Sequence, residues 1–253
     1  MFDYFSVNGK TILITGGNSG LGAAMAKAFI KAGTNVIITG RSEKKNRKFS
    51  DDGFNVYKLD VRLENEVKKV INDIINTYGN IDVLINNAGI YQSHELIYLK
   101  EKDWDNIINT NLKGMYLCSK YCVKSMINNQ NGGKIINIGS AYSVFGHPNS
   151  VGYATSKSAV LGFTRSLACE LGPNNIQVNA ILPGWFKTDM NKGVPDSHRG
   201  NDIKRQTPCG RWGNPEDIVG TIIFLASQAS DFITGTTISV DGGYMISDRY
   251  IYD

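Results

Sequence analysis

Cysteine and histidine are scarce in this 253-residue chain, and their spacing disfavours the common metal and disulfide frameworks. The four cysteines form no CxxC pair, which argues against a zinc finger and against a disulfide-stapled secreted domain. We expect reduced thiols at Cys118, Cys122, Cys169 and Cys209. The three histidines lie far apart in unlike contexts. The sequence therefore predicts no metal site.

Long apolar runs and a strong excess of one charge are also lacking. No stretch approaches the roughly 20 residues that a membrane-spanning helix needs, and the opening MFDYFSVNGK lacks the basic and apolar regions of a secretory leader. The net charge is +4, and basic residues are scattered outside one segment. Neither nucleic-acid nor membrane-surface binding is indicated, so we expect a cytoplasmic protein whose partners are small molecules.

What the sequence does contain is an alternation of two patterns. Short runs rich in Val, Ile and Leu occupy residues 10–15, 35–39, 54–59, 81–86, 134–139, 176–181 and 236–241. Between them, apolar residues recur at helical spacing over 63–78, 104–127 and 152–171. Continuously apolar strands are typical of parallel sheets covered on both faces. The alternation predicts an α/β fold, a doubly wound parallel sheet of the Rossmann-like type, with residues 1–253 as a single domain.

Two connections depart from even spacing. Residues 40–53, GRSEKKNRKFSDDG, are too few for a full helix with two loops, so we expect a stunted helix or a plain loop. Residues 184–213 carry glycines and prolines without a strong period. Long irregular segments in compact domains often cover active sites, and we interpret this one as a mobile substrate lid.

A glycine-rich loop, TGGNSGLG at 15–22, follows the first predicted strand and precedes a helix. Gly16, Gly20 and Gly22 allow unusual dihedral angles and let backbone N–H groups approach a pyrophosphate at the positive helix N-terminus. A glycine triplet alone is weak evidence, but this context of strand and helix makes it specific. We therefore predict a dinucleotide-binding loop rather than a turn without a ligand.

The end of the second predicted strand bears on which dinucleotide is bound. An acidic residue there usually accepts from the ribose 2′-OH of NAD, whereas a basic one accommodates the 2′-phosphate of NADP. Gly40 takes the place of the acid, and Arg41 follows. The only concentrated positive patch of the chain comes next, at Lys44, Lys45, Arg47 and Lys48, although it can also be interpreted as a solvated basic loop. NADP is predicted over NAD.

Tyr153 and Lys157 lie four positions apart in GYATSKSAV, within a predicted helix. Such positions are about 5–6 Å apart on a helix. A phenol with a pKa near 10 is a poor base unless a cation favours its anion, so we expect Lys157 to lower the pKa of Tyr153. The alternative is structural, a buried ring beside a solvated ammonium. Ser140 ends the fifth predicted strand and should meet Tyr153 at the carboxyl edge of the sheet.

These features together resemble the short-chain dehydrogenase/reductase family over nearly all of the chain. The resemblance is carried by TGGNSGLG (15–22), LDV (59–61), NNAG (86–89), Asn111, Ser140, YATSK (153–157) and PGWFKT (183–188). It implies hydride transfer between a nicotinamide cofactor and a carbonyl or secondary alcohol, in a homotetramer. The catalytic residues that it implies are Asn111, Ser140, Tyr153 and Lys157. Tyr153 would move the proton, Ser140 would stabilise the substrate oxygen, and Asn111 would complete a proton relay with Lys157.

The same resemblance implies a set of cofactor contacts. They are Gly16, Asn18, Ser19, Gly20, Leu21, Gly22, Arg41, Asp60, Val61, Asn87, Ala88, Gly89, Tyr153, Lys157, Pro183, Gly184, Phe186 and Thr188. By similarity, Asp60 and Val61 would frame the adenine, and Asn87 would lie beside the ribose and nicotinamide. For Asn86, a ligand contact and a side chain that staples adjacent strands remain equally open.

The substrate is less well determined. EKDWD (101–105), GGKIINI (132–138), FKTDM (186–190), RWGNPEDI (211–218) and SDFITG (230–235) resemble segments of gluconate and deoxygluconate dehydrogenases. Some are shared with 3-oxoacyl carrier-protein reductases and with sugar alcohol or steroid enzymes. Candidate substrate contacts are Tyr91, His94, Tyr142, His147, Trp185 and His198, although residues of these types are more often incidental cleft or surface residues than specific contacts.

The charges of the lid bear on the choice of substrate. Basic side chains outnumber acidic ones there, with Lys187, Lys192, His198, Arg199, Lys204 and Arg205 against Asp189, Asp196 and Asp202. A closed lid would offer positive charge to an anionic substrate, unless the segment is only a solvated loop. We predict a role in carbohydrate metabolism, with keto-aldonates such as 5-ketogluconate as substrates. A 3-oxoacyl carrier-protein reductase and a catalytically silent dinucleotide-binding regulator are the alternatives.

Overall fold

The computed structural model describes residues 3–128 and 132–248. Its strands are β1 Thr11–Thr15, β2 Asn35–Gly40, β3 Asn55–Lys58, β4 Val83–Asn86, β5 Gly133–Ile138, β6 Ile176–Pro183 and β7 Thr237–Val240. They form one parallel sheet in the order β3-β2-β1-β4-β5-β6-β7. All seven predicted strands are present, and the prediction of a doubly wound parallel sheet is confirmed.

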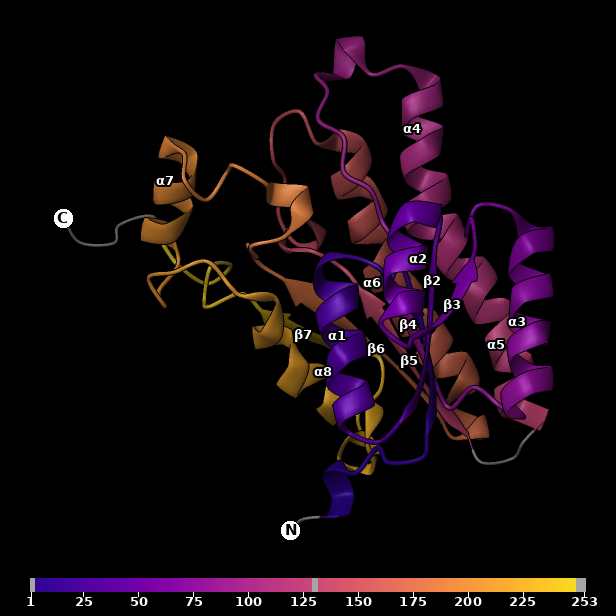
Figure 1. The fold of residues 1–253 in the computed structure, drawn as a ribbon. Coiled ribbons are helices and arrows are strands. Elements are labelled where there is room, and N and C mark those ends of the chain that lie inside the picture. Colours follow the sequence, from indigo (N-terminus) through magenta and orange to yellow (C-terminus); the bar gives the residue numbers. More distant parts are fainter. Residues whose placement is uncertain (1–2, 129–131, 249–253) are drawn as a thin grey trace.

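Helices cover both faces of this sheet (Figure 1). They are α1 Gly20–Lys31, α2 Glu43–Asp51, α3 Glu64–Tyr78, α4 Glu101–Ile108, α5 Gly114–Asn128, α6 Val151–Leu171, α7 His198–Gln206 and α8 Val219–Ala226. The buried side chains of α1, α2 and α8 belong to one apolar cluster, and those of α3, α5 and α6 mainly to another. Helix α7 stands apart from these layers, beyond the carboxyl ends of the strands (Figure 1).

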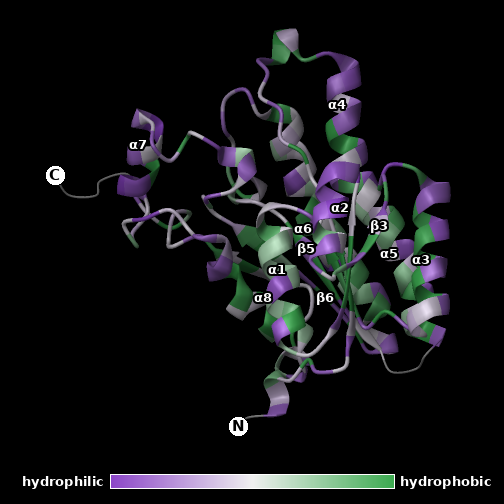
Figure 2. Ribbon diagram, viewed as in Figure 1, coloured by the Kyte–Doolittle hydropathy of each residue, from purple (hydrophilic) through white to green (hydrophobic). Residues whose placement is uncertain are grey.

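The alternation of strand side chains explains the two clusters. Ile12 and Ile14 of β1 pack on the side of α1 and α8, whereas Leu13 between them packs on the side of α3 and α5. Each is fully buried, and burying one such side chain contributes about 1.5–3 kcal/mol. Figure 2 shows the result, with hydrophobic strands at the centre and hydrophilic residues on the outer faces of the helices. The runs are continuously apolar because both faces are covered.

The predicted helix over 104–127 is interrupted. Helix α4 passes through a π-helical turn at Asn109–Lys113 before α5 begins. The Asn111 side chain leaves this turn to bind the backbone of Ile90, donating to its carbonyl at 3.0 Å and accepting from its N–H at 2.8 Å. Such bulges are frequent at functional sites.

The two irregular connections contain more structure than their sequences indicate. Of the two alternatives for residues 40–53, the stunted helix is correct, because α2 has nine residues. The Ser42 hydroxyl accepts from the Lys45 N–H at the start of this helix. Segment 184–213 contains α7, which the sequence did not predict. Ser197 caps α7 by accepting from Gly200 N–H at 3.1 Å, and Trp212 Nε1 donates to the Gly200 carbonyl at 3.0 Å. Over 3–128 and 132–248, no helix is long and apolar enough to cross a membrane.

Candidate active site

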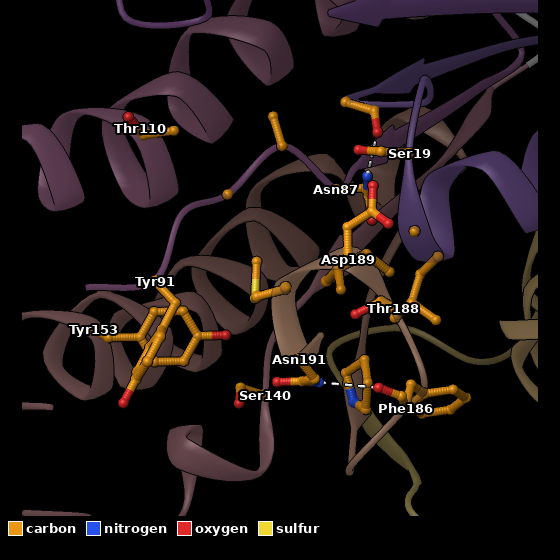
Figure 3. Close-up of a pocket in the computed structure, with 18 of the residues that line it drawn as sticks. Ser19, Asn87, Tyr91, Thr110, Ser140, Tyr153, Phe186, Thr188, Asp189 and Asn191 are labelled. Carbon is orange, nitrogen blue, oxygen red and sulfur yellow. Dashed lines mark hydrogen bonds between the residues drawn. The ribbon is translucent and has the colours of Figure 1, made fainter. Parts of the chain in front are cut away.

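A cavity of about 480 Å³ lies at the carboxyl edge of the sheet. Its wall comes from residues that follow β1, β2, β4, β5 and β6, from the start of α6, and from the segment that leads into α7. Ligands of open α/β sheets bind at this edge. In the close-up, Tyr91, Tyr153 and Ser140 lie at one end, and Ser19 and Asn87 lie at the other (Figure 3).

The glycine loop after β1 is held in one conformation. Gly16 and Gly20 adopt φ angles of 64° and 52°, which favour glycine. A Cβ atom on Gly22 would lie 2.5 Å from the Gly16 carbonyl oxygen, so no other residue fits there without movement. Asn87 Nδ2 donates to the carbonyls of Thr15 and Gly16 at 2.9 and 3.0 Å. Because the Ser19 side chain makes no capping hydrogen bond, the first N–H groups of α1 keep their capacity to bind a phosphate.

The end of β2 explains why no acid stands at position 40. A Cβ atom there would collide with the side chain of Asn18, which donates to Asn46 Oδ1 at 2.7 Å. Asn46 Nδ2 donates in turn to the Gly40 carbonyl at 2.8 Å. Arg41 and Lys45 line the cavity beside this contact, whereas Lys44, Arg47 and Lys48 do not. The positive patch is therefore partly directed at the cavity and partly solvated.

Two threonine residues of the cavity wall carry hydroxyls without a partner among the described residues, and the wall also holds an ion pair. Thr39 Oγ1 and Thr110 Oγ1 are buried without a hydrogen-bond partner in the described chain, and both residues line the cavity. Lys45 Nζ lies 3.1 Å from the Asp189 carboxylate, an exposed pair that contributes little to stability. Orphaned hydroxyls, a glycine cradle and two cations fit a polar, phosphorylated ligand such as a dinucleotide.

Ser140, Tyr153 and Lys157 meet at the opposite end. Ser140 lies just beyond β5, and Tyr153 and Lys157 lie in the first turns of α6. Ser140 Oγ accepts from the Tyr142 N–H at 3.2 Å, which leaves its own proton to donate. The Tyr153 ring packs edge-on against Tyr91 and Tyr142, with centroids 5.1 and 5.9 Å away. The phenol is therefore fixed in an aromatic pocket beside a hydroxyl donor.

The ionisation of this pair differs from the prediction. Burial raises the pKa of Tyr153 above its usual value, and a hydrogen bond with Ser140 only partly offsets this. Lys157 does not lower the pKa of Tyr153 here, because its ammonium donates to the Ile138 carbonyl at 2.7 Å and lies 5.8 Å from the ring centroid. Burial lowers the pKa of Lys157 itself to about 8. At neutral pH the Tyr153 phenol thus carries its proton, and the Lys157 side chain is charged in most molecules.

Asn111 and Asn86 lie behind the cavity wall. Asn111 is fully buried, and besides binding Ile90 it donates to Ser156 Oγ at 3.0 Å. Asn86 Nδ2 donates to Asn137 Oδ1 of the neighbouring strand at 2.9 Å. Of the two alternatives for Asn86, this contact matches the one in which its side chain links adjacent strands. Neither side chain lines the cavity.

Most of the predicted site residues come together. Of the predicted cofactor contacts, only Gly22 and Asp60 do not line the cavity; Gly22 lies beneath the loop, and the Asp60 carboxylate binds Arg62. Of the candidate substrate contacts, Tyr91, Tyr142 and Trp185 line the cavity, and His94, His147 and His198 do not. His147 nevertheless stacks on Tyr142 with centroids 5.1 Å apart.

Several wall residues were not predicted. Among them are Thr39, Thr110, Met190, Asn191 and Val194. Thr39 was accessible to sequence reasoning, because it lies on the strand end that also carries Arg41. The positions of Met190, Asn191 and Val194 depend on the path of segment 184–213, for which the sequence contains no periodic signal.

Cysteine and histidine give no further site. Cys118 and Cys122 are buried, and burial raises the pKa of the Cys118 thiol to about 12. Cys169 and Cys209 are exposed. In the part of the chain that the structure describes, no three His, Cys, Asp or Glu residues are placed to hold a metal ion.

The chain is similar over almost its whole length to proteins of known sequence and structure. A family model described as enoyl-(acyl carrier protein) reductase matches residues 16–245. A 3-oxoacyl-[acyl-carrier-protein] reductase of Thermotoga maritima is 39% identical over 246 residues, which cover 95% of this chain and 99% of the relative. A 2-dehydro-3-deoxy-D-gluconate 5-dehydrogenase of Escherichia coli is 38% identical over 246 residues, 95% and 97% of the two chains. A gluconate 5-dehydrogenase of Burkholderia cenocepacia, solved in complex with NADP and tartrate, superposes with a TM-score of 0.91 at 35% identity over 97% and 99% of the two chains.

Proposed function

The chain belongs to the short-chain dehydrogenase/reductase family and is an NAD(P)-dependent oxidoreductase acting on CH–OH groups; from this premise we propose that it uses NADP and interconverts the keto and hydroxy forms of a sugar acid. The observation that carries the proposal is the different chemistry of the two ends of this cavity. Arg41 and Lys45 line one end, and Ser140 and Tyr153 line the other. A phosphorylated cofactor and a small polar ketone match these two ends.

The residues of the chain divide the chemistry between them. NADPH, when bound, supplies the hydride that reaches the carbonyl carbon. Tyr153 donates its phenolic proton to the carbonyl oxygen as negative charge develops there, and it accepts a proton from the alcohol in the reverse direction. Ser140 donates a hydrogen bond to the same oxygen. The Lys157 ammonium donates to the Ile138 carbonyl and so holds the end of β5, just before Ser140. The buried Asn111 keeps the π-helical turn and Ile90 in place behind the cavity wall.

The preference for NADP rests on the end of β2. Position 40 has no room for the carboxylate that would accept from the ribose 2′-OH, because Asn18 occupies that space. Arg41 follows at the cavity wall, where its planar guanidinium suits a phosphate group. The gluconate 5-dehydrogenase of B. cenocepacia was solved with NADP, which supports the same choice.

A sugar acid is favoured over an acyl thioester by the lid. The lid residues at the cavity include Asp189, Asn191 and Arg199 beside the apolar Trp185, Phe186, Met190 and Val194, so the lid offers polar and charged groups that a sugar acid can use. We propose that residues 184–213 act as a substrate cover. The similarity to enzymes named for gluconate and 2-dehydro-3-deoxygluconate agrees with this.

The test is a side-by-side measurement of kcat/KM with NADPH for 5-ketogluconate and acetoacetyl thioesters. We expect the keto-aldonate to be the better substrate. A clear win for the thioester would transfer the assignment to the second candidate, a 3-oxoacyl carrier-protein reductase, which the equally high identity to the T. maritima enzyme favours. No oxidation of NADPH with any ketone of a broad panel would favour a silent dinucleotide-binding regulator.

We further propose that the chain assembles as a homotetramer. Tyr116 and Ile127 of α5 and Val151 of α6 are exposed apolar side chains, and closed two-fold assemblies are the common way to cover such faces. Sedimentation at micromolar concentration should give the mass of four chains, and a monomer would contradict the proposal.

A further inference from the structure

Two buried hydrogen-bond donors at the substrate end of the cavity have no partner. They are the Tyr142 hydroxyl and Trp185 Nε1, and neither finds an acceptor among residues 3–128 and 132–248. Tyr142 is only 5% exposed, yet both residues line the cavity. Their rings meet edge-on with centroids 6.1 Å apart. Leaving a buried donor unsatisfied costs about 1–3 kcal/mol, so a pair of them in one wall points to a ligand that accepts from both.

A cation stands next to these donors. The Arg199 guanidinium, from the first turn of α7, lies 5.4 Å from the centroid of the Trp185 ring and lines the same cavity. It also lies 2.9 Å from His147 Nε2. Because Arg can only donate, His147 accepts at Nε2 and carries its proton on Nδ1, which lies 2.7 Å from the Pro148 carbonyl. The guanidinium is thus held in place by a ring and a histidine, and among the described residues no carboxylate forms an ion pair with it.

The negative charge on the wall lies at the other end of the cavity. Asp189 is the acidic residue that lines the cavity, and it is paired with Lys45, near Ser19 and Asn87 rather than near Tyr153 (Figure 3). Tyr142 stays a donor, because burial raises the pKa of its hydroxyl. The surroundings of Tyr142, Trp185 and Arg199 therefore offer donors and positive charge together.

We propose that Tyr142, Trp185 and Arg199 form a subsite for the carboxylate of the substrate. Two neutral donors and a guanidinium match the oxygens of a carboxylate, and charge-assisted hydrogen bonds are the stronger kind. The Tyr142 ring also packs against Tyr153, with centroids 5.9 Å apart, so an anion held here leaves the rest of a short polyhydroxy chain to reach the catalytic phenol. The inference rests on the proposed sugar-acid function and names the residues that would select the acid.

The experiment compares two small probes that share a carbon skeleton and differ in their end groups, which are anionic in one and neutral in the other. Tartrate carries two carboxylates, and threitol has the same four-carbon skeleton with hydroxymethyl groups in their place. Calorimetry with saturating NADP should show that the wild type binds tartrate more tightly than threitol. Arg199→Leu should weaken tartrate binding about 10- to 100-fold, the equivalent of one charge-assisted contact, and should leave threitol nearly unchanged. Arg205→Leu, on the same helix but paired with Asp202 and away from the cavity, is the matched control and should bind tartrate like the wild type.

Two conservative variants keep the test independent of the folding of α7. Tyr142→Phe and Trp185→Phe remove one donor each and retain an aromatic ring, and each should weaken tartrate binding about 10-fold. The subsite is overturned if tartrate binds the wild type no better than threitol does, if Arg199→Leu keeps the wild-type affinity, or if both aromatic variants do.

Activity separates the subsite from the proposed function. L-sorbose has the skeleton of 5-ketogluconate with a hydroxymethyl group in place of the carboxylate. Arg199→Leu should raise KM for 5-ketogluconate and not for L-sorbose, with kcat less affected. If the wild type prefers acetoacetyl thioesters while tartrate binding still requires Arg199, the sugar-acid function is wrong and the anion subsite stands.

Discussion

The burial of the Lys157 ammonium predicts how the free energy of unfolding changes with pH, and this can be tested without a substrate. Lys157 is 4% exposed. Its ammonium donates a hydrogen bond to the Ile138 carbonyl at 2.7 Å. Burial lowers its pKa from 10.5 to about 8, a difference of about 2.5 units. One pKa unit corresponds to about 1.4 kcal/mol, so at pH 7 the charged form costs the folded state about 3 kcal/mol.

The sign of the pH dependence follows from proton counting. Between about pH 8 and 10.5 the unfolded chain binds a proton at Lys157 that the folded chain has lost. Stability rises with pH wherever the unfolded state binds more protons. The free energy of unfolding of the wild type should therefore gain about 1.5 kcal/mol between pH 8 and pH 9.5, relative to a variant without the amine.

The assay is urea unfolding of wild type and Lys157→Met at pH 7.0, 8.0, 9.0 and 9.5 without cofactor. Urea is neutral and leaves electrostatic screening unchanged, and all other titrations cancel in the difference between the two proteins. At pH 7 that difference should be small, because Met avoids the burial cost but leaves the Ile138 carbonyl without its donor. Lys204→Met removes an exposed ammonium from α7 and serves as the control. A difference between wild type and Lys157→Met that stays flat or shrinks with rising pH would refute the reasoning.

Three further predictions concern the chemistry and the cofactor. Tyr153→Phe should lower kcat about 100-fold or more while changing the Kd for NADP less than twofold, and a near-normal kcat would remove Tyr153 from the mechanism. The wild type should prefer NADP to NAD in kcat/KM, and Arg41→Asp should reverse much of that preference because the new carboxylate repels a 2′-phosphate. Lys48→Asp, at a residue away from the cavity, should leave the preference unchanged. Equal use of both cofactors by the wild type would contradict the argument. Gly22→Ala should weaken NADP binding at least 10-fold and cost about 1–3 kcal/mol of stability, because its Cβ would meet the Gly16 carbonyl. Gly220→Ala on α8, whose Cβ meets no atom within 4 Å, should be stable, and equal behaviour of the two alanine variants would argue against a tight cradle.

The fold was predictable because its two signals are local. Central strands such as β1 are buried on both faces, which produces a continuous apolar run. Crossover helices such as α3 bury one stripe, which produces a period of 3.6. Parallel order and right-handed crossovers then place all strand ends at one edge. The π-helical turn at Asn109–Lys113 was not predicted, because the contact that accompanies it is long-range. In that contact the Asn111 side chain binds the backbone of Ile90.

The direction of the pKa shift of Tyr153 was predicted wrongly for a related reason. Spacing on the helix correctly placed Lys157 one turn away, but it did not reveal that the Ile138 carbonyl holds the ammonium or that Tyr91 and Tyr142 surround the phenol. Desolvation depends on what packs around a group, and every one of these neighbours comes from another element of the fold. A pattern of residue types can therefore propose a catalytic pair, whereas the protonation state requires the three-dimensional surroundings.

The two ends of the cavity differ in the same way. Its cofactor end consists of loops that directly follow β1, β2 and β4, so sequence adjacency to a strand was enough to find Gly16, Arg41 and Asn87. Its substrate end requires α7, which is fastened by the hydrogen bond from Trp212 Nε1 to the Gly200 carbonyl and by the buried Ile203. Only that attachment brings Arg199 over the Trp185 ring. Members of one family can therefore share the cofactor end, which local rules determine, and differ in substrate through the packing of a lid that such rules do not reach.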